Sequence, residues 1–125
     1  MSKCILVIDD ELDIRDVVCL SLEEFGGWYT ESAGSGAEGL DKAQAAPWDC
    51  ILLDVSMPEM DGLAVYERLQ ADDKTRPIPV ILLTAKVLAA DHDRFTSLGV
   101  AGVIAKPFDP ITIWQRVAQI LDWAT

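Results

Sequence analysis

The sequence predicts an α/β fold in which a parallel five-stranded sheet is covered by helices on both faces. Two observations carry this prediction: short apolar runs alternate with longer amphipathic segments, and most of the runs are apolar at successive positions. Such strands are buried on both sides, which is typical of a parallel sheet between two helical layers. The chain has 125 residues, half of them hydrophobic, so we expect one domain with its own core.

Five short runs are the strand candidates. Four of them are rich in Ile, Leu and Val, whereas the second is more polar and is the weaker candidate. In chain order the runs are CILVI (4–8), WYTESA (28–33), CILLDV (50–55), VILLTA (80–85) and VIA (103–105).

Each run is followed by a segment with helical periodicity, so the predicted order is strand then helix, five times. In chain order the segments are ELDIRDVVCLSLEEF (11–25), SGAEGLDKAQA (35–45), LAVYERLQA (63–71), LAADHDRFTSLG (88–99) and PITIWQRVAQILDW (110–123).

The first helix shows its buried face most clearly. Apolar residues recur there every three or four positions, which predicts one face that packs on the sheet. These residues are Ile14, Val18, Leu22 and Phe25. The glycines at 26–27 are expected to end this helix.

The later helices carry boundary signals as well. SGAE (35–38) fits a capping box at the start of the second helix. In the fourth helix, Leu88, Phe95 and Leu98 are expected to face inward. Pro110 suits the first turn of the last helix.

Charge and cysteine content limit the partners and the cellular location that we expect for the protein. The chain has 10 Lys and Arg against 21 Asp and Glu, a net charge of −11. Because nucleic acids and anionic membranes bind clustered basic residues, we expect neither as a partner. The N-terminus lacks a secretory signal, and no apolar run is long enough to span a membrane. Cys4, Cys19 and Cys50 lack C-x-x-C spacing, which favours a cytoplasmic location.

Polar residues follow four of the five strand candidates. In chain order these residues are Asp9 with Asp10, Asp54, Thr84 and Lys106. The carboxyl ends of parallel strands meet at one edge of the sheet, where such folds bind ligands. Contact with solvent explains one polar residue at a strand end, but not this combination, so we expect a site.

The residue types point to a metal and a phosphoryl group. Two carboxylates about 5 Å apart repel by roughly 3 kcal/mol at an effective dielectric constant near 20. Mg²⁺ would relieve this repulsion, because it prefers oxygen ligands and takes one or two carboxylates. Asp54 is the expected nucleophile, since a carboxylate can form an acyl phosphate. Thr84 and Lys106 could contact the phosphoryl oxygens, and the turn after Asp54 would free the Ser56 carbonyl for the metal.

Four motifs in this order resemble the receiver domain of two-component response regulators. They are IDDE (8–11), LLDVSMPEMDG (52–62), LLTA (82–85) and KPF (106–108), and the resemblance covers essentially the whole chain. It implies a flavodoxin-like (βα)5 doubly wound sheet with strand order 2-1-3-4-5. It also implies a cis peptide bond between Lys106 and Pro107.

The resemblance implies a role for each site residue. Asp54 would accept a phosphoryl group from a phosphohistidine on a sensor histidine kinase or histidine phosphotransfer protein, and would lose it by slow self-hydrolysis. Asp10, Asp54 and the Ser56 carbonyl would ligate Mg²⁺, with Asp9 acting mainly through water. Thr84 and Lys106 would contact the phosphoryl group. Such a protein is a phosphoacceptor switch and is not expected to be an enzyme.

We expect a single receiver domain over residues 1–125, without an output domain. It would switch a surface that binds an unknown downstream protein, as a monomer or weak homodimer. One departure leaves an alternative open: Val103 stands where the family usually carries Tyr or Phe, three residues before the lysine. The alternative is a receiver-like interaction or dimerisation module without phosphorylation.

Two other classes fit the strand ends less well. An aspartate phosphatase needs D-x-D after the first strand, and a flavin protein needs a hydroxyl-rich phosphate loop there. The segment DDELD (9–13) offers neither. The resemblance also implies that Lys86 tunes the access of the hydrolytic water, so Lys86→Ala should change the lifetime of the phosphorylated form.

Overall fold

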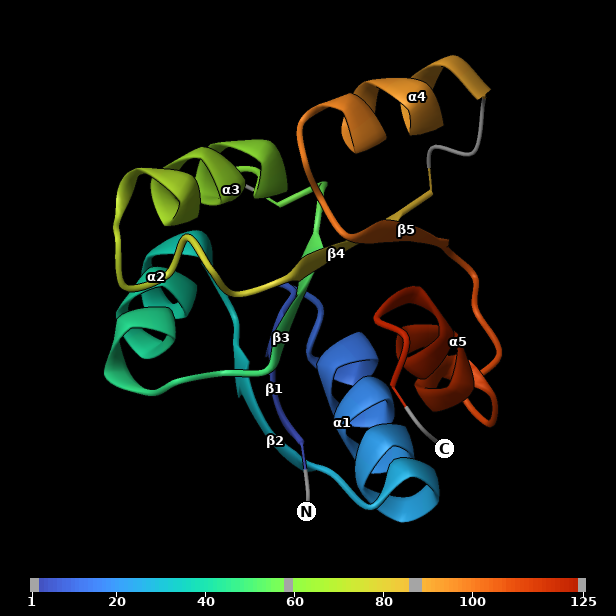
Figure 1. The fold of residues 1–125 in the computed structure, drawn as a ribbon. Helices are drawn as coiled ribbons and strands as arrows, with labels where there is room; N and C mark the ends of the chain where they lie inside the picture. Colours follow the sequence, from blue (N-terminus) through green and yellow to red (C-terminus); the bar gives the residue numbers. More distant parts are fainter. Residues whose placement is uncertain (1–2, 58–59, 86–88, 124–125) are drawn as a thin grey trace.

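A computed structural model describes residues 3–57, 60–85 and 89–123 of the chain. The strands form a parallel five-stranded sheet with the order β2-β1-β3-β4-β5, as predicted (Figure 1). Their bounds are β1 Cys4–Ile8, β2 Tyr29–Ala33, β3 Cys50–Asp54, β4 Val80–Thr84 and β5 Gly102–Ala105. The helices that connect and follow them are α1 Leu12–Gly26, α2 Gly36–Ala45, α3 Gly62–Ala71, α4 Ala89–Ser97 and α5 Ile113–Ile120.

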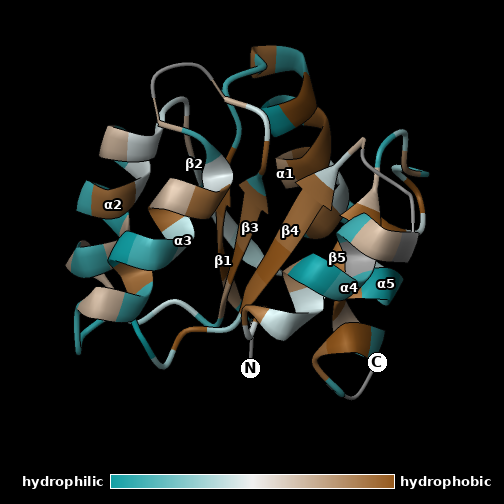
Figure 2. Cartoon of the chain, turned by 90° about the horizontal axis from the view of Figure 1, so that it is seen from above, coloured by the Kyte–Doolittle hydropathy of each residue, from teal (hydrophilic) through white to brown (hydrophobic). Residues whose placement is uncertain are grey.

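The two faces of the sheet carry two separate apolar cores. In β1, Ile5 and Val7 pack toward α1 and α5, whereas Leu6 and Ile8 pack toward α2, α3 and α4. Figure 1 shows α1 and α5 together on one side of the sheet and α2, α3 and α4 on the other. The central strands β1, β3 and β4 are hydrophobic, whereas the helices on either side mix hydrophobic and hydrophilic residues (Figure 2). This arrangement explains why the central strands are apolar at successive positions until the polar residues at their carboxyl ends.

Tryptophans are divided between the two cores. Trp48 lies in the core under α2, α3 and α4, and its indole N–H donates to the Lys42 carbonyl at 2.8 Å. The other three pack against the opposite core, where the Trp28 ring meets Trp123 edge-on at 5.2 Å and Trp114 at 6.3 Å between ring centroids.

Two predicted inward residues point outward. Phe25 is 51% exposed and Leu98 is 47% exposed. At the end of α1, Gly27 takes a left-handed φ of 70°, and the chain returns so that the Trp28 amide donates to the Leu22 carbonyl. Trp28 therefore closes the core where Phe25 was expected. Leu98 lies just beyond the end of α4, next to Gly99 at φ 99°.

Helix α5 is shorter than predicted because a turn precedes it. The Asp109 carboxylate accepts the Ile111 amide at 2.9 Å, and the Asp109 carbonyl accepts the amides of Thr112 and Ile113. Residues 110–112 are consequently a turn and not the first turn of the helix. Half of the predicted capping box is present at α2: Ser35 Oγ accepts the Glu38 amide, whereas the Glu38 carboxylate accepts the Gly34 amide and not that of Ser35. Within the described residues, no helix is long and apolar enough to cross a membrane.

Candidate functional site

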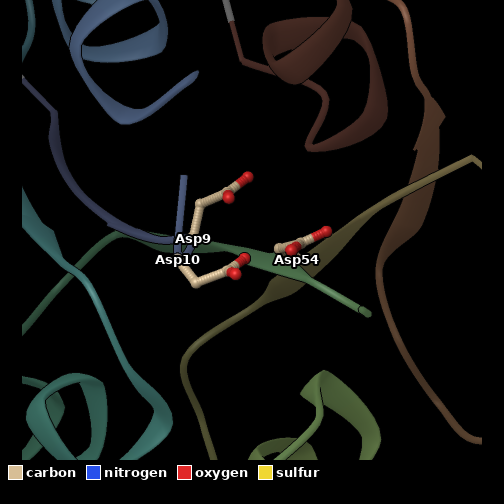
Figure 3. A group of neighbouring side chains, drawn as sticks. All are labelled: Asp9, Asp10 and Asp54. Carbon is tan, nitrogen blue, oxygen red and sulfur yellow. The ribbon is translucent and has the colours of Figure 1, made fainter. Parts of the chain in front are cut away.

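The predicted polar residues gather at the carboxyl edge of the sheet. Asp9 and Asp10 follow β1, Asp54 is the last residue of β3, Thr84 is the last residue of β4, and Lys106 follows β5. The pairing of Ile8 with Leu53 sets Asp9 level with Asp54. One oxygen from each of Asp9, Asp10 and Asp54 lies within 4.8 Å of the others. Figure 3 shows the three carboxylates turned toward the same region.

Lys106 supplies the positive charge of the site. Its Nζ lies 2.9 Å from Asp9 Oδ2 and 3.1 Å from Asp54 Oδ1, and 3.9 Å from Glu11 Oε1. The Lys106 amide donates to the Thr84 carbonyl at 2.8 Å, which ties the start of this loop to β4. The Lys106–Pro107 peptide bond is cis, as the resemblance implied.

Burial and charge shift two pKa values at the site. Burial, with the neighbouring Asp9 carboxylate, raises the pKa of Asp54 from 3.8 to about 6, although Lys106 acts in the opposite direction. Burial lowers the pKa of Lys106, but its hydrogen bonds to Asp9 and Asp54 outweigh this and raise the pKa overall. Burial is the largest of these causes at Asp54, so the site disfavours the charged form of this carboxyl group even with Lys106 beside it.

The donor set fits a small hard cation. Asp10 Oδ1 and Asp54 Oδ2 are buried and have no hydrogen-bond partner. A buried acceptor without a partner costs free energy, so two of them at one place indicate room for a positive group. Carboxylate oxygens are the ligands that Mg²⁺ prefers. The residues present therefore fit a divalent cation.

The loop after Asp54 is shaped by Gly62. A Cβ on Gly62 would lie 2.2 Å from the Asp54 carbonyl oxygen and 2.8 Å from Val55 Cα, so no other residue fits without movement of the backbone. The Gly62 amide donates to the Val55 carbonyl at 2.9 Å, and the Asp61 carboxylate caps α3 by accepting the Ala64 amide. The start of α3 is thus seated directly on the backbone that carries Asp54.

The remaining predicted residues lie around this cluster. Thr84 is buried at the end of β4, and Ser56 is exposed two residues beyond Asp54. Val103 is buried, with 8% of its surface exposed, in the core that faces α2, α3 and α4. Lys86 lies outside the described residues. The roles assigned to Thr84, Ser56 and Lys86 remain predictions.

Sequence reasoning missed two features of the site. It assigned no role to Gly62, whose close approach to Asp54 depends on how α3 packs. It also passed over Arg15, which donates to the Asp9 carbonyl at 2.9 Å. A basic residue within the acidic stretch DDELDIRD (9–16) is the signal that could have drawn attention to it.

The chain is similar in sequence to known proteins. The family model described as the response regulator receiver domain matches residues 5–118. The transcriptional regulator RpaA of Synechocystis is 36% identical over 117 residues, which cover 94% of this chain and 48% of RpaA. The phosphate regulon regulator PhoB of Escherichia coli is 36% identical over 125 residues, which cover 97% of this chain and 52% of PhoB.

Solved structures show the same fold. Chemotaxis protein CheY4 of Vibrio cholerae aligns with a TM-score of 0.88 and 29% identity, over 96% of this chain and 99% of CheY4. The N-terminal domain of a response regulator receiver protein from Methanoculleus marisnigri aligns with a TM-score of 0.77 and 36% identity, over 97% and 98% of the two chains.

One expectation about partners is wrong. The net charge led us to expect no nucleic-acid partner, but RpaA is described as a DNA-binding dual master transcriptional regulator, and PhoB is a transcriptional regulatory protein. The chain spans about half the length of these two relatives. A charge counted over these residues cannot exclude contacts made by other parts of such proteins.

Proposed function

The chain belongs to the response regulator receiver domain family of two-component systems, and on this premise we propose that Asp54 accepts a phosphoryl group from a phosphohistidine donor. The observation that carries the proposal is the setting of Asp54. Its carboxyl group is buried, with 2% of the residue exposed; Oδ1 is held by Lys106, and Oδ2 has no partner. Lys106 therefore holds the carboxylate in place without occupying both of its oxygens.

The transfer is a displacement at phosphorus. An Asp54 oxygen attacks the phosphorus atom, a new O–P bond forms, and the N–P bond breaks with its electron pair returning to the donor imidazole. The signal ends by hydrolysis of the acyl phosphate. A water oxygen attacks the same phosphorus, the bond to Asp54 breaks, and inorganic phosphate leaves. The phosphoryl group is gained and lost on the protein's own Asp54. We therefore propose that the protein is a phosphoacceptor switch and not an enzyme.

Lys106 positions and neutralises charge in this scheme. Its ammonium group bridges Asp9 and Asp54, and once Asp54 carries the phosphoryl group it can donate to a phosphoryl oxygen in place of the carboxylate. The Thr84 hydroxyl, at the end of the neighbouring strand, would donate to another. Both groups would offset charge that develops on phosphoryl oxygens in the transition state.

The metal we propose is Mg²⁺, which receiver domains bind at an acidic pocket. Asp10, Asp54 and the Ser56 carbonyl would hold it, with Asp9 acting mainly through a bound water. When bound, it would offset the negative charge of the carboxylates and of the incoming phosphoryl group. The two orphaned oxygens of Asp10 and Asp54 support this assignment.

Intact-mass spectrometry after incubation with acetyl phosphate and MgCl₂ tests the function. We expect one phosphoryl adduct on the wild-type chain, none on Asp54→Asn, and none when EDTA replaces MgCl₂. Asp41→Asn, which removes an exposed carboxylate on α2, should be modified like the wild type. An unmodified wild type would favour the alternative, an interaction module that retains the fold without phosphorylation. Val103, which stands at the usual aromatic position, is the observation that favours this alternative.

A further inference from the structure

Arg15 joins two loops beside the acidic cluster. It lies in the first turns of α1, and its side chain reaches back to the residues that follow β1 and β2. We infer that Arg15 is a positioning residue for the Asp9–Asp10 pair, and that Gly34 provides the space its guanidinium occupies. This inference rests on the proposed Mg²⁺ site and assigns a residue that holds it in shape.

The contact falls on the peptide group that links the two acidic residues. Arg15 Nη1 donates to the Asp9 carbonyl at 2.9 Å. Around it, the Asp9 amide donates to the Ala33 carbonyl at 3.1 Å, and Asp9 Oδ1 accepts the Glu11 amide at 2.9 Å. The Asp9 amide is therefore fixed by β2, and the Asp9 carbonyl is fixed by Arg15. A turn of this peptide group would swing Asp10, so the arginine fixes the direction of the second carboxylate.

Gly34 makes room for the arginine. A Cβ on Gly34 would lie 2.6 Å from Arg15 Nη1 and 3.2 Å from Cζ. Both atoms belong to the flexible end of the side chain, whereas the Gly34 amide is anchored to Glu38 Oε1 at 2.7 Å. A methyl group at position 34 should consequently displace the guanidinium and leave the backbone in place. Glycine is required here for space, because its φ does not lie in the left-handed region.

The guanidinium makes few other interactions. Within residues 3–57, 60–85 and 89–123 it forms no ion pair, and its Nε is buried without a hydrogen-bond partner. Arg15 is half-buried, and in a chain with 21 acidic residues its guanidinium is held by a backbone carbonyl instead of a carboxylate. A role in orienting the acidic pair accounts for this placement, since outer partners of metal ligands typically change metal affinity about 10- to 100-fold.

A Mg²⁺ titration of the ¹⁵N-labelled full chain, followed by amide chemical shifts, tests the inference. We expect Arg15→Ala to weaken Mg²⁺ binding about tenfold or more, and Arg15→Lys to recover part of the loss, because an ammonium can still donate to the carbonyl. Gly34→Ala should weaken binding to a similar extent. In the Arg15→Ala background, however, Gly34→Ala should add nothing, since no guanidinium remains to be displaced.

The outcomes separate the inference from the proposed function. If the wild type shows no saturable Mg²⁺ shifts, the proposed metal site fails. If the wild type binds and both Arg15→Ala and Gly34→Ala bind equally well, Arg15 does not position the acidic pair. A loss of unfolding free energy in urea without a change in Mg²⁺ affinity, or additive losses in the double variant, would also overturn the inference. Should Arg15→Ala fail to fold, the Arg15→Lys and Gly34→Ala variants decide.

Discussion

The substitution Asp54→Asn should change the pH dependence of stability when no divalent cation is present. Burial and the Asp9 carboxylate raise the pKa of Asp54 from 3.8 to about 6. Ionising Asp54 is therefore harder in the folded chain than in the unfolded chain. At 1.36 kcal/mol for each pKa unit, the ionised carboxylate costs the folded state roughly 3 kcal/mol above pH 6.

The sign follows from proton binding. Between about pH 4 and pH 6 the folded chain keeps a proton on Asp54 that the unfolded chain has already released. The stabilising contribution of this group is complete below the unfolded pKa and is lost as the pH rises through the folded value. The asparagine does not titrate, so the free energy of unfolding of Asp54→Asn, minus that of the wild type, should rise by roughly 2.5 kcal/mol from about pH 4 to about pH 7.

Urea unfolding in EDTA, followed by far-ultraviolet circular dichroism across this pH range, measures the difference. Asp41→Asn is the matched control, because it removes one carboxylate from an exposed position on α2; its difference from the wild type should stay nearly constant. Adding MgCl₂ at neutral pH should stabilise the wild type more than Asp54→Asn, by an amount that grows with the Mg²⁺ concentration. Equal differences at the two ends of the pH range would refute the electrostatic reasoning.

Three further substitutions test contacts around the site and within the layer of α2, α3 and α4. Gly62→Ala should lower the unfolding free energy in urea by about 3 kcal/mol, because the new Cβ would lie 2.2 Å from the Asp54 carbonyl oxygen; a neutral effect would contradict the close approach. Thr75→Val should cost about 1–2 kcal/mol in the same assay, since Thr75 is buried and donates to the Leu69 carbonyl at 2.6 Å. Tyr66→Phe removes a 3.1 Å hydrogen bond to a backbone carbonyl just after α4, so amide exchange in α4 should quicken; unchanged exchange would count against that link.

The sheet and its active edge could be predicted from the sequence because short-range patterns encode them. Continuous apolar runs predict a buried parallel sheet. Because all the strands run in the same direction, the residues that follow them lie at the same edge of the sheet. The positions of Asp9, Asp54 and Lys106 therefore needed no knowledge of distant contacts. The strand order came from the resemblance to a family, since periodicity within a segment does not say which strands are neighbours.

Other features depend on contacts between distant segments, and there the sequence was less informative. Phe25 continues the apolar periodicity of α1, yet Trp28 takes the core at that end because Gly27 turns the chain back. The space that Gly34 leaves for Arg15 depends on how the loop after β2 meets α1. The prediction of no nucleic-acid partner from the net charge failed for a different reason. The charge was counted over a chain that spans about half the length of RpaA and PhoB.

The distribution of the tryptophans gives the protein an internal set of fluorescent reporters. Trp48 lies in the core under α2, α3 and α4. Trp28, Trp114 and Trp123 pack on the opposite core, where the ring of Trp28 contacts the other two edge-on. A Trp48→Phe variant would leave an emission signal that belongs to the α1–α5 layer alone, and its difference from the wild type would isolate the opposite layer. Loss of order on the two sides of the sheet could then be timed separately with no attached dye.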